Sequence, residues 1–298
     1  MGNNSERMKA LLLMTILAII WGMENVFASM LLTSYSTFTI LLCKYMVATV
    51  FLTIVMVASG ARDFAKPKDI PLFILCGATG SLLYYFFEFS AIKYISVSLA
   101  TVILTFVPVV SVLIEALVLK RKFNGKLYAG ILVTVLGAIF VVGIDLDSLA
   151  GGKTIGIVLA FSAVLSWNAY NFVSEKIAHK YHYINIAWTQ ILCTTIMTLP
   201  FGIGGLREAE FNIATIMIIV ILGIGGAGCA YMIMPISIKA LGPTLTGMFS
   251  NLMPIVATIG GWLILNQRIT LLQISGTAIL IAASCYVIRE KGRLEKQT

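Results

Sequence analysis

Long apolar runs separated by short polar gaps make up almost the whole chain. A helix needs about 20 residues to cross the hydrocarbon core of a bilayer. Runs of that length occur ten times, at 9–32, 36–58, 70–91, 97–119, 126–144, 154–176, 184–205, 212–236, 243–265 and 270–288. Polar and apolar residues do not alternate in them as they do in the strands of membrane barrels. The pattern therefore predicts an all-α integral membrane protein with ten transmembrane helices.

The composition excludes a water-soluble fold. Apolar residues make up 59% of the chain, charged residues only 11%, and the mean hydropathy is +0.97, whereas a soluble domain is about one-quarter charged. No gap between runs is long enough for a soluble domain. Arg7 and Lys9 before the first run also resemble a signal peptide, but the run continues to Leu32 without a clear cleavage site, so we expect a retained helix. The five cysteines lie within the runs and are interpreted as packing residues.

The net charge of +8 follows membrane topology rather than nucleic-acid binding, because the basic residues sit in short gaps without interleaved aromatics. With the amino terminus in the cytoplasm, four basic residues fall outside: Lys93, Lys153, Arg207 and Arg268. Sixteen fall inside: Arg7, Lys9, Arg62, Lys66, Lys68, Lys120, Arg121, Lys122, Lys126, Lys176, Lys180, Lys239, Arg289, Lys291, Arg293 and Lys296. The positive-inside rule thus predicts a multi-pass cell-membrane protein with both termini cytoplasmic.

The second half of the chain repeats the first at a shift of 146 residues. The matched positions are Trp21 with Trp167, Asn25 with Asn171, Gly77 with Gly223, Gly80 with Gly226, Tyr85 with Tyr231, Ile92-Lys93 with Ile238-Lys239, Pro108 with Pro254 and Gly130 with Gly276. Apolar matches alone mean little in such a chain, but rare residue types in one register over more than a hundred positions indicate a duplication.

Each predicted repeat, 9–144 and 154–288, has five spans, so the two copies cross the membrane in opposite directions. The charges agree with opposite orientations. The gap after the fourth span contains the basic cluster 120–126, whereas the equivalent gap after the ninth span reads Asn266-Gln267-Arg268 and has one basic residue. Inverted repeats supply two related conformations, one open to each side, as in alternating-access carriers. This pattern favours transport.

The same residues resemble the drug/metabolite transporter superfamily and its duplicated EamA domain, in a ten-helix bacterial form. The similarity lies in the early Trp and Asn of each half, in the segments 91–94 and 119–122 with Pro108 and Gly130, and in their counterparts 237–240, 265–268, Pro254 and Gly276. The resemblance covers nearly the whole chain and implies a carrier of small organic molecules. It implies a basic residue in the second span of the first half, where Lys44 lies, and Gln190 takes its place in the second half.

Four charged residues lie within the spans, where a charge at mid-bilayer costs about 2.5–3.5 kcal/mol on insertion scales. Glu24 and Lys44 have similar depth on consecutive helices and are expected to pair, either as a structural ion pair or as a pair that binds substrate or a proton. Glu88 continues a polar stripe and either faces the cavity or reaches interfacial water. Glu115 lies one turn from the basic cluster 120–122 and is expected to form an interfacial salt bridge.

The candidate substrate-binding residues are Trp21, Glu24, Asn25, Lys44, Tyr84, Tyr85, Glu88, Trp167, Tyr170, Asn171 and Tyr231. A Trp face with an amide one turn away binds flat or cationic organic groups, although the same pattern also occurs in plain helix packing. Pro108 and Pro254 are expected to kink their helices at mid-span, either as hinges or as inert bends. The glycines Gly223, Gly225, Gly226 and Gly228 are expected to allow close helix approach.

Nothing in the chain favours an enzyme. His179 and His182 lie in a predicted loop without convergent carboxylates or thiols, and a Walker-type loop is absent. We expect no cofactor, and a secondary carrier that exports an amino acid or a derivative, with the proton as a candidate coupling ion. Uptake of a choline-like cation and a non-transporting membrane sensor remain alternatives. The oligomeric state is open between monomer and homodimer.

Overall fold

The fold is known from a computed structural model, which describes residues 4–294 except 62, 119, 122, 143–151, 248, 250–251 and 267–270. The described residues form helices and no strand. The first half contains α1 (Asn4–Leu31), α2 (Thr37–Ser59), η1 (Pro67–Asp69), α3 (Ile70–Gly77), η2 (Ala78–Leu83), α4 (Tyr84–Ile92), α5 (Val97–Leu104), α6 (Val107–Leu117) and α7 (Gly125–Val142). The second contains α8 (Gly152–Ala178), α9 (Tyr183–Glu208), α10 (Ile213–Ile221), η4 (Leu222–Cys229), α11 (Ala230–Leu241), α12 (Pro243–Gly247), α13 (Met253–Leu265) and α14 (Leu271–Leu294).

Among the described residues, seven helical segments are long and apolar enough to cross a membrane. They overlap, to within two residues at most ends, the predicted spans that begin at residues 9, 36, 70, 97, 154, 184 and 212. The other three predicted spans fall on shorter or less apolar helices, α7, α12 with α13, and α14. The protein is therefore an all-helical, multi-pass membrane protein, and the count of ten crossings stays a prediction.

Polar caps at the ends of the apolar runs set the helix boundaries. The Ser36 hydroxyl accepts a hydrogen bond from Thr39 N at 3.1 Å and begins α2, and Ser96 begins α5 by accepting one from Leu99 N at 3.2 Å. Such caps satisfy backbone N–H groups that have no partner within the helix. Gly60 ends α2 in the left-handed conformation, with φ of 66°, which costs glycine little.

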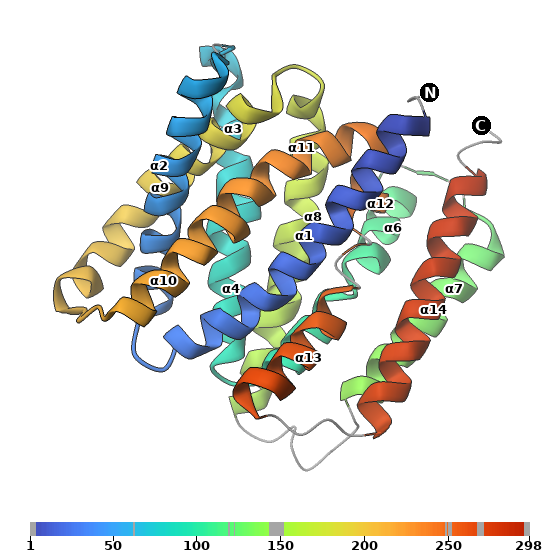
Figure 1. The fold of residues 1–298 in the computed structure, drawn as a ribbon. Coiled ribbons are helices and arrows are strands. Elements are labelled where there is room, and N and C mark those ends of the chain that lie inside the picture. The colour runs from blue at the N-terminus through green and yellow to red at the C-terminus, as the bar shows by residue number, and fades with distance from the viewer. Residues whose placement is uncertain are drawn as a thin grey trace.

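The helix contacts follow the inverted repeat (Figure 1). In the first half α1 packs against η4, α11 and α13, and in the second half its counterpart α8 packs against η2, α4, α5 and α6. The second helices of the two halves, α2 and α9, lie side by side, and so do the fifth, α7 and α14. A pseudo-twofold axis relates these pairs, as expected for inverted repeats.

Residues related by the 146-residue shift meet on this axis. The hydroxyls of Thr49 and Thr195 are hydrogen-bonded at 2.8 Å, and the rings of Trp21 and Trp167 are in edge-to-face contact. The repeat also fixes local backbone geometry. Among described residues other than glycine, positive φ occurs only at Lys120 and Asn266, which are also 146 residues apart and both have φ of 52°.

The two ends of the bundle, face A and face B, are defined by the helices that begin and end there. At face A, α1 and α4 end and α8 begins: Ser29 and Ile92 line one pocket, and Gly156 packs against Ile95. At face B, the loop after α8 meets the start of the third span, where Lys180 pairs with Asp69. It follows that α1 runs toward face A and α8 runs toward face B.

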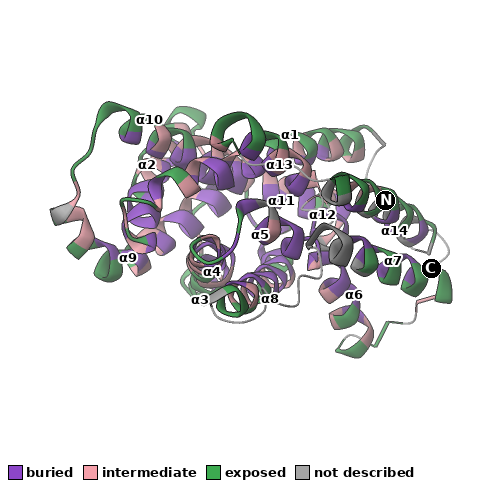
Figure 2. Cartoon of the chain, turned by 90° about the horizontal axis from the view of Figure 1, so that it is seen from below, coloured by how far each residue is buried: buried purple, intermediate pink, exposed green. Residues whose placement is uncertain are grey.

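Residues on the outside of the bundle are mostly exposed and those between helices are buried (Figure 2), and many of the exposed residues are large and apolar. Along α2, for example, Val50, Ile54 and Val57 are 62%, 63% and 72% exposed. An apolar stripe of this kind costs free energy in water and none against lipid. All five cysteines are free thiols; Cys43 and Cys76 are buried, as expected of packing residues, whereas Cys285 is exposed.

The helix of the fourth span is interrupted at mid-span, where a kink at Pro108 was expected. The fourth span is two helices, α5 and α6, and Pro108 lies in the first turn of α6; Pro254 lies in the first turn of α13. Proline fits there because the first helical N–H groups need no partner within the helix. Pro108 thus lies just after a two-residue turn that interrupts the helix of the fourth span.

Two π-helical segments were not predicted from the sequence. η2 lies at 78–83 in the third span, and η4 lies at 222–229 in the eighth, at equivalent positions of the two repeats. π-helical turns are rare and are frequently found at functional sites. Both segments lie against the centre of the bundle, where most of the candidate residues gather.

Candidate functional site

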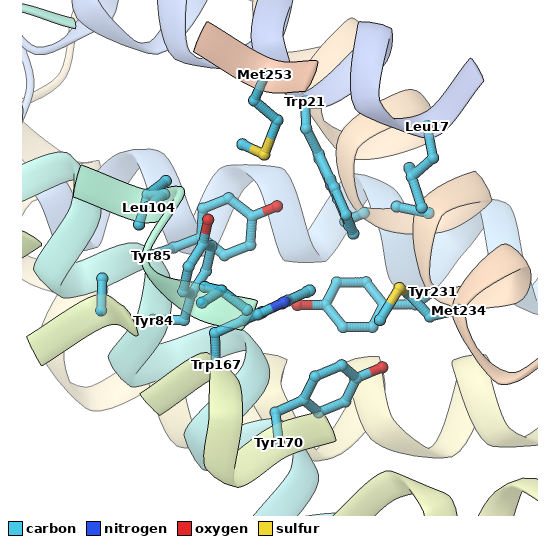
Figure 3. Close-up of a cluster of buried hydrophobic side chains, with 14 of the residues drawn as sticks. Leu17, Trp21, Tyr84, Tyr85, Leu104, Trp167, Tyr170, Tyr231, Met234 and Met253 are labelled. Atoms are coloured by element: carbon cyan, nitrogen blue, oxygen red, sulfur yellow. The ribbon is translucent and has the colours of Figure 1, made fainter. Parts of the chain in front are cut away.

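Aromatic side chains from both repeats gather at the centre of the bundle (Figure 3). The indoles of Trp21 and Trp167 cross nearly at right angles with ring centroids 5.3 Å apart. The Trp167 ring also lies 4.6 Å from Tyr84 and 4.9 Å from Tyr170, and Tyr231 lies 6.0 Å from Tyr170. These contacts bring together candidate residues from α1, α4, α8 and α11. Such a wall binds flat apolar or cationic groups.

The π-helical segments hold this aromatic cluster through their carbonyls. Trp21 Nε1 donates to Gly226 O at 3.2 Å, and the hydroxyl of Tyr231 donates to the equivalent carbonyl, Gly80 O. Each bond links an aromatic residue of one repeat to the π segment of the other. The carbonyl of Ser81 likewise accepts a hydrogen bond from the hydroxyl of Tyr45 at 2.9 Å.

Glycine is required where the two repeats approach most closely. A Cβ atom at Gly80 would lie 2.4 Å from the Tyr170 ring, and one at Gly226 would lie 2.3 Å from Glu24 Oε2. Tyr170 and Glu24 are themselves repeat partners, so the same contact occurs twice around the axis. The expected role of Gly226 and Gly223 in close approach is confirmed, since Gly223 packs directly on Val47.

Glu24 and Lys44 form a buried ion pair beside the aromatic cluster, as their depth predicted. Lys44 Nζ donates to Glu24 Oε1, and the two residues are 0% and 2% exposed. The other carboxylate oxygen accepts a hydrogen bond from Tyr85 at 3.2 Å, and Lys44 Nζ lies 3.2 Å from the centroid of the Tyr85 ring. The pair therefore ties α1, α2 and α4 together.

Glu88 belongs to the same polar cluster. It is only 1% exposed, so the alternative that it reaches interfacial water is wrong. Its Oε1 accepts a hydrogen bond from Asn25 Nδ2 at 3.0 Å, and it also bonds Tyr84. The hydrogen-bond partners that the structure gives this carboxylate are neutral. Glu24, Lys44 and Glu88 thus place two carboxylates and one ammonium group in a region shielded from solvent.

The second repeat has no charges at the corresponding positions. The counterparts of Glu24, Lys44 and Glu88 are Tyr170, Gln190 and Met234. Asn25 and Asn171, in contrast, are present in both halves and are 1% and 0% exposed. The aromatic and amide parts of the site are therefore symmetric, and the charges are confined to the first repeat.

Glu115 is separate from this cluster. Its Oε2 accepts a hydrogen bond from Arg121 at 3.2 Å, and the arginine is 61% exposed. The predicted salt bridge with the basic cluster near the end of the fourth span is present, with Arg121 as its partner.

Two repeat-equivalent tyrosines form hydrogen bonds between the two repeats, one at each face of the bundle. At face A, the hydroxyl of Tyr35 donates to Glu210 O at 2.5 Å. At face B, its counterpart Tyr181 donates to Asp69 Oδ2 at 2.7 Å, and Lys180 bonds Asp69 Oδ1 at 3.0 Å. Each tyrosine joins the beginning of one repeat's second helix to the beginning of the other repeat's third span. Sequence analysis missed both, although the 146-residue register marks them as a pair.

The fold and site define a class of protein, a membrane transporter built from inverted repeats. A family model described as the EamA-like transporter family matches residues 8–143 and again 154–289. The chain belongs to this family, within the drug/metabolite transporter superfamily, and its relatives are transporters rather than enzymes.

The chain is similar to several curated proteins. It is 26% identical over 256 residues to a "Probable amino-acid metabolite efflux pump" of Escherichia coli, covering 79% of this chain and 83% of the relative. A "Probable terminal-alkyne amino-acid exporter" of Streptantibioticus cattleyicolor is 24% identical over 195 residues, 64% of this chain and 63% of that one. An "Uncharacterized transporter" of Archaeoglobus fulgidus is 22% identical over 95% of this chain and 100% of the relative.

A solved crystal structure shares the fold. It superposes with a TM-score of 0.76 over 97% of this chain and 99% of that chain, at 19% sequence identity. At this identity the similarity supports the architecture and carries no information on substrate.

Proposed function

We propose that this protein is a secondary active transporter that exports an amino acid or an amino-acid derivative by alternating access. It would lie in the cell membrane with both termini in the cytoplasm. The observation that carries the proposal is the central cluster, where repeat-equivalent Trp21 and Trp167 touch and are flanked by buried carboxylate, ammonium and amide groups. An amphipathic zwitterion offers groups that match each of these.

The names of two relatives support the amino-acid part of this proposal. One is named as an amino-acid metabolite efflux pump and another as an amino-acid exporter. Uptake of a choline-like cation fits the cluster less well. A quaternary ammonium binds on aromatic faces, and Lys44 already occupies the face of Tyr85.

The proton is our candidate coupling ion. The cluster holds two carboxylates and one ammonium, so full ionisation leaves one buried negative charge, which is costly away from water. A proton or the ammonium group of a substrate on Glu88 would each balance it. If the proton and the substrate bind Glu88 in exchange for each other, an inward proton gradient drives export of the substrate.

Substrate counterflow in proteoliposomes tests the proposal. Vesicles loaded with unlabelled amino acid should accumulate the labelled compound transiently, and Trp21→Ala and Trp167→Ala should each reduce that accumulation. Trp262→Ala is the matched control, because Trp262 is 55% exposed on the outside of the bundle. Absence of counterflow across a broad panel of amino acids and amines, with well-folded protein, would rule out the amino-acid proposal.

A further inference from the structure

The two repeat-equivalent asparagines, Asn25 and Asn171, lie on opposite sides of the tryptophan pair. Trp21 and Trp167 touch at the centre, and each asparagine follows its tryptophan by four residues, about 6 Å along the helix axis. Because α1 runs toward face A and α8 toward face B, Asn25 lies on the face A side and Asn171 on the face B side. The inverted repeat thus divides the polar centre into two half-sites.

The residues of each half-site share one side of the tryptophans. Glu88 is one turn from the end of α4 at face A, and Lys44 is two turns from the start of α2 at the same face. The face A half-site therefore contains Glu24, Asn25, Lys44 and Glu88. Their repeat counterparts form the face B half-site: Tyr170, Asn171, Gln190 and Met234.

Buried polar atoms without partners mark both half-sites as places for a ligand. Asn25 Oδ1 has no hydrogen-bond partner within the described part of the chain, although Asn25 Nδ2 is bonded to Glu88. Both Nδ2 and Oδ1 of Asn171, as well as Gln190 Oε1, also have no such partner. A buried polar group is costly unless it is hydrogen-bonded, so native proteins rarely leave one without a partner.

The free atoms differ in the chemistry that they accept. At face A, an acceptor oxygen stands beside a carboxylate whose partners are neutral, which suits a group that is cationic and donates hydrogen bonds. At face B, Asn171 offers one donor and one acceptor, and the counterparts of Glu24, Lys44 and Glu88 in this half-site are uncharged. A neutral amide or carbonyl-containing group suits that pair.

We propose that the transport path has two chemically different binding sites, one for a substrate ammonium group at Glu88 and Asn25, and one for a neutral amide-like group at Asn171. This proposal rests on the proposed function for the identity of the substrate as amino-acid-like, but the two sites can be tested without transport. The predicted topology places the cationic site in the outer half of the membrane.

Binding to purified protein in detergent tests the chemistry. Phenethylamine, a cation with an aromatic side chain, should raise the melting temperature of the unaltered protein. Glu88→Gln should weaken this binding at least about tenfold, and Asn171→Ala should leave it unchanged. The neutral amide 3-phenylpropanamide should show the reverse pattern. Glu115→Gln is the matched control, because this buried carboxylate lies outside both half-sites.

Access from one side tests the location. Single cysteines at Lys93 and Lys239 should react from opposite sides of the membrane, since the two repeats are inverted. In vesicles of known orientation, phenethylamine added at the Lys93 side should inhibit exchange of labelled phenylalanine more strongly than when it is loaded at the Lys239 side. Glu88→Gln should remove this difference by weakening inhibition at the Lys93 side alone.

Several results would overturn the proposal. Equal effects of Glu88→Gln and Asn171→Ala on both compounds would mean one shared site, and no thermal shift with either compound would mean no site of this chemistry. If both compounds bind as expected while no amino acid is exchanged, the two sites stand and the proposed amino-acid transport fails. Failure of the two proposals is therefore distinguishable.

Discussion

Lys44→Met should destabilise the protein more than Glu24→Gln, although the two residues form one ion pair. Removing Lys44 leaves Glu24 and Glu88 in the same buried cluster with no cation between them, and breaking a buried pair typically costs about 3–5 kcal/mol. When Glu24 is removed, Lys44 still has a carboxylate of opposite charge nearby, because Glu88 also interacts with Lys44 electrostatically. We expect the smaller cost of one lost buried hydrogen bond, about 1–3 kcal/mol.

The double variant Glu24→Gln/Lys44→Met separates a structural role from a functional one. It keeps the same net charge in the cluster as the unaltered protein, so its stability should recover above that of Lys44→Met alone. Stability is measured as the melting temperature in one detergent, and counterflow is measured in parallel. A pair that serves only to hold helices should regain transport in the double variant, and a pair that binds substrate or proton should not.

We expect the second result. Equal stability of the two single variants would refute the reasoning, because it would mean that Glu88 does not share the charge of Lys44. If neither single variant lowers the melting temperature or transport, the contact between Glu24 and Lys44 does not contribute to stability or transport.

Two further predictions use matched positions. Gly226→Ala should sharply reduce folded protein because its Cβ would lie 2.3 Å from Glu24 Oε2, whereas Gly225→Ala, with its nearest contact at 3.5 Å, should be tolerated; equal expression of both would contradict the close approach. Tyr181→Phe removes a hydrogen bond to Asp69 at face B, about 1.5–3 kcal/mol for a charged partner, and should raise cysteine labelling of the interior from that face. Tyr35→Phe should raise cysteine labelling from face A. If labelling rises from the same face in both variants, the two tyrosine hydrogen bonds do not act at opposite faces.

The sequence predicted the architecture well because the duplication is recorded in rare residues. Trp21 with Trp167 and Gly80 with Gly226 fixed the 146-residue register, and the structure places these pairs in contact or in equivalent contacts around one axis. The predicted pairing of Glu24 with Lys44 also followed from helix length and depth alone. The sequence pattern was sufficient to predict a contact wherever that contact depended only on a residue's position along a straight helix.

Prediction failed where the helix was not straight. Hydropathy does not distinguish an α-helical turn from a π-helical one, so η2 and η4 were missed, and with them the carbonyls that hold Tyr231 and Trp21. A proline within an apolar run indicates disturbed pairing, but it does not tell a kink from two separate helices. The burial of Glu88 depended on neighbours from α1, which its own span does not reveal.

The asymmetry of charge has a consequence for the direction of transport. Two identical inverted repeats would give two end states of equal free energy, because each is the other seen from the opposite side. Here the first repeat joins α1, α2 and α4 through Glu24, Lys44 and Tyr85, and the second repeat has Tyr170, Gln190 and Tyr231 at the same positions. Opening the face A half-site must therefore separate or hydrate charged groups, and opening the face B half-site need not. A ligand shifts such an equilibrium only by its difference in affinity for the two states. Under the proposed function, a substrate ammonium group that binds Glu88 would supply that difference on the face A side alone, and opening at face A would depend on bound substrate.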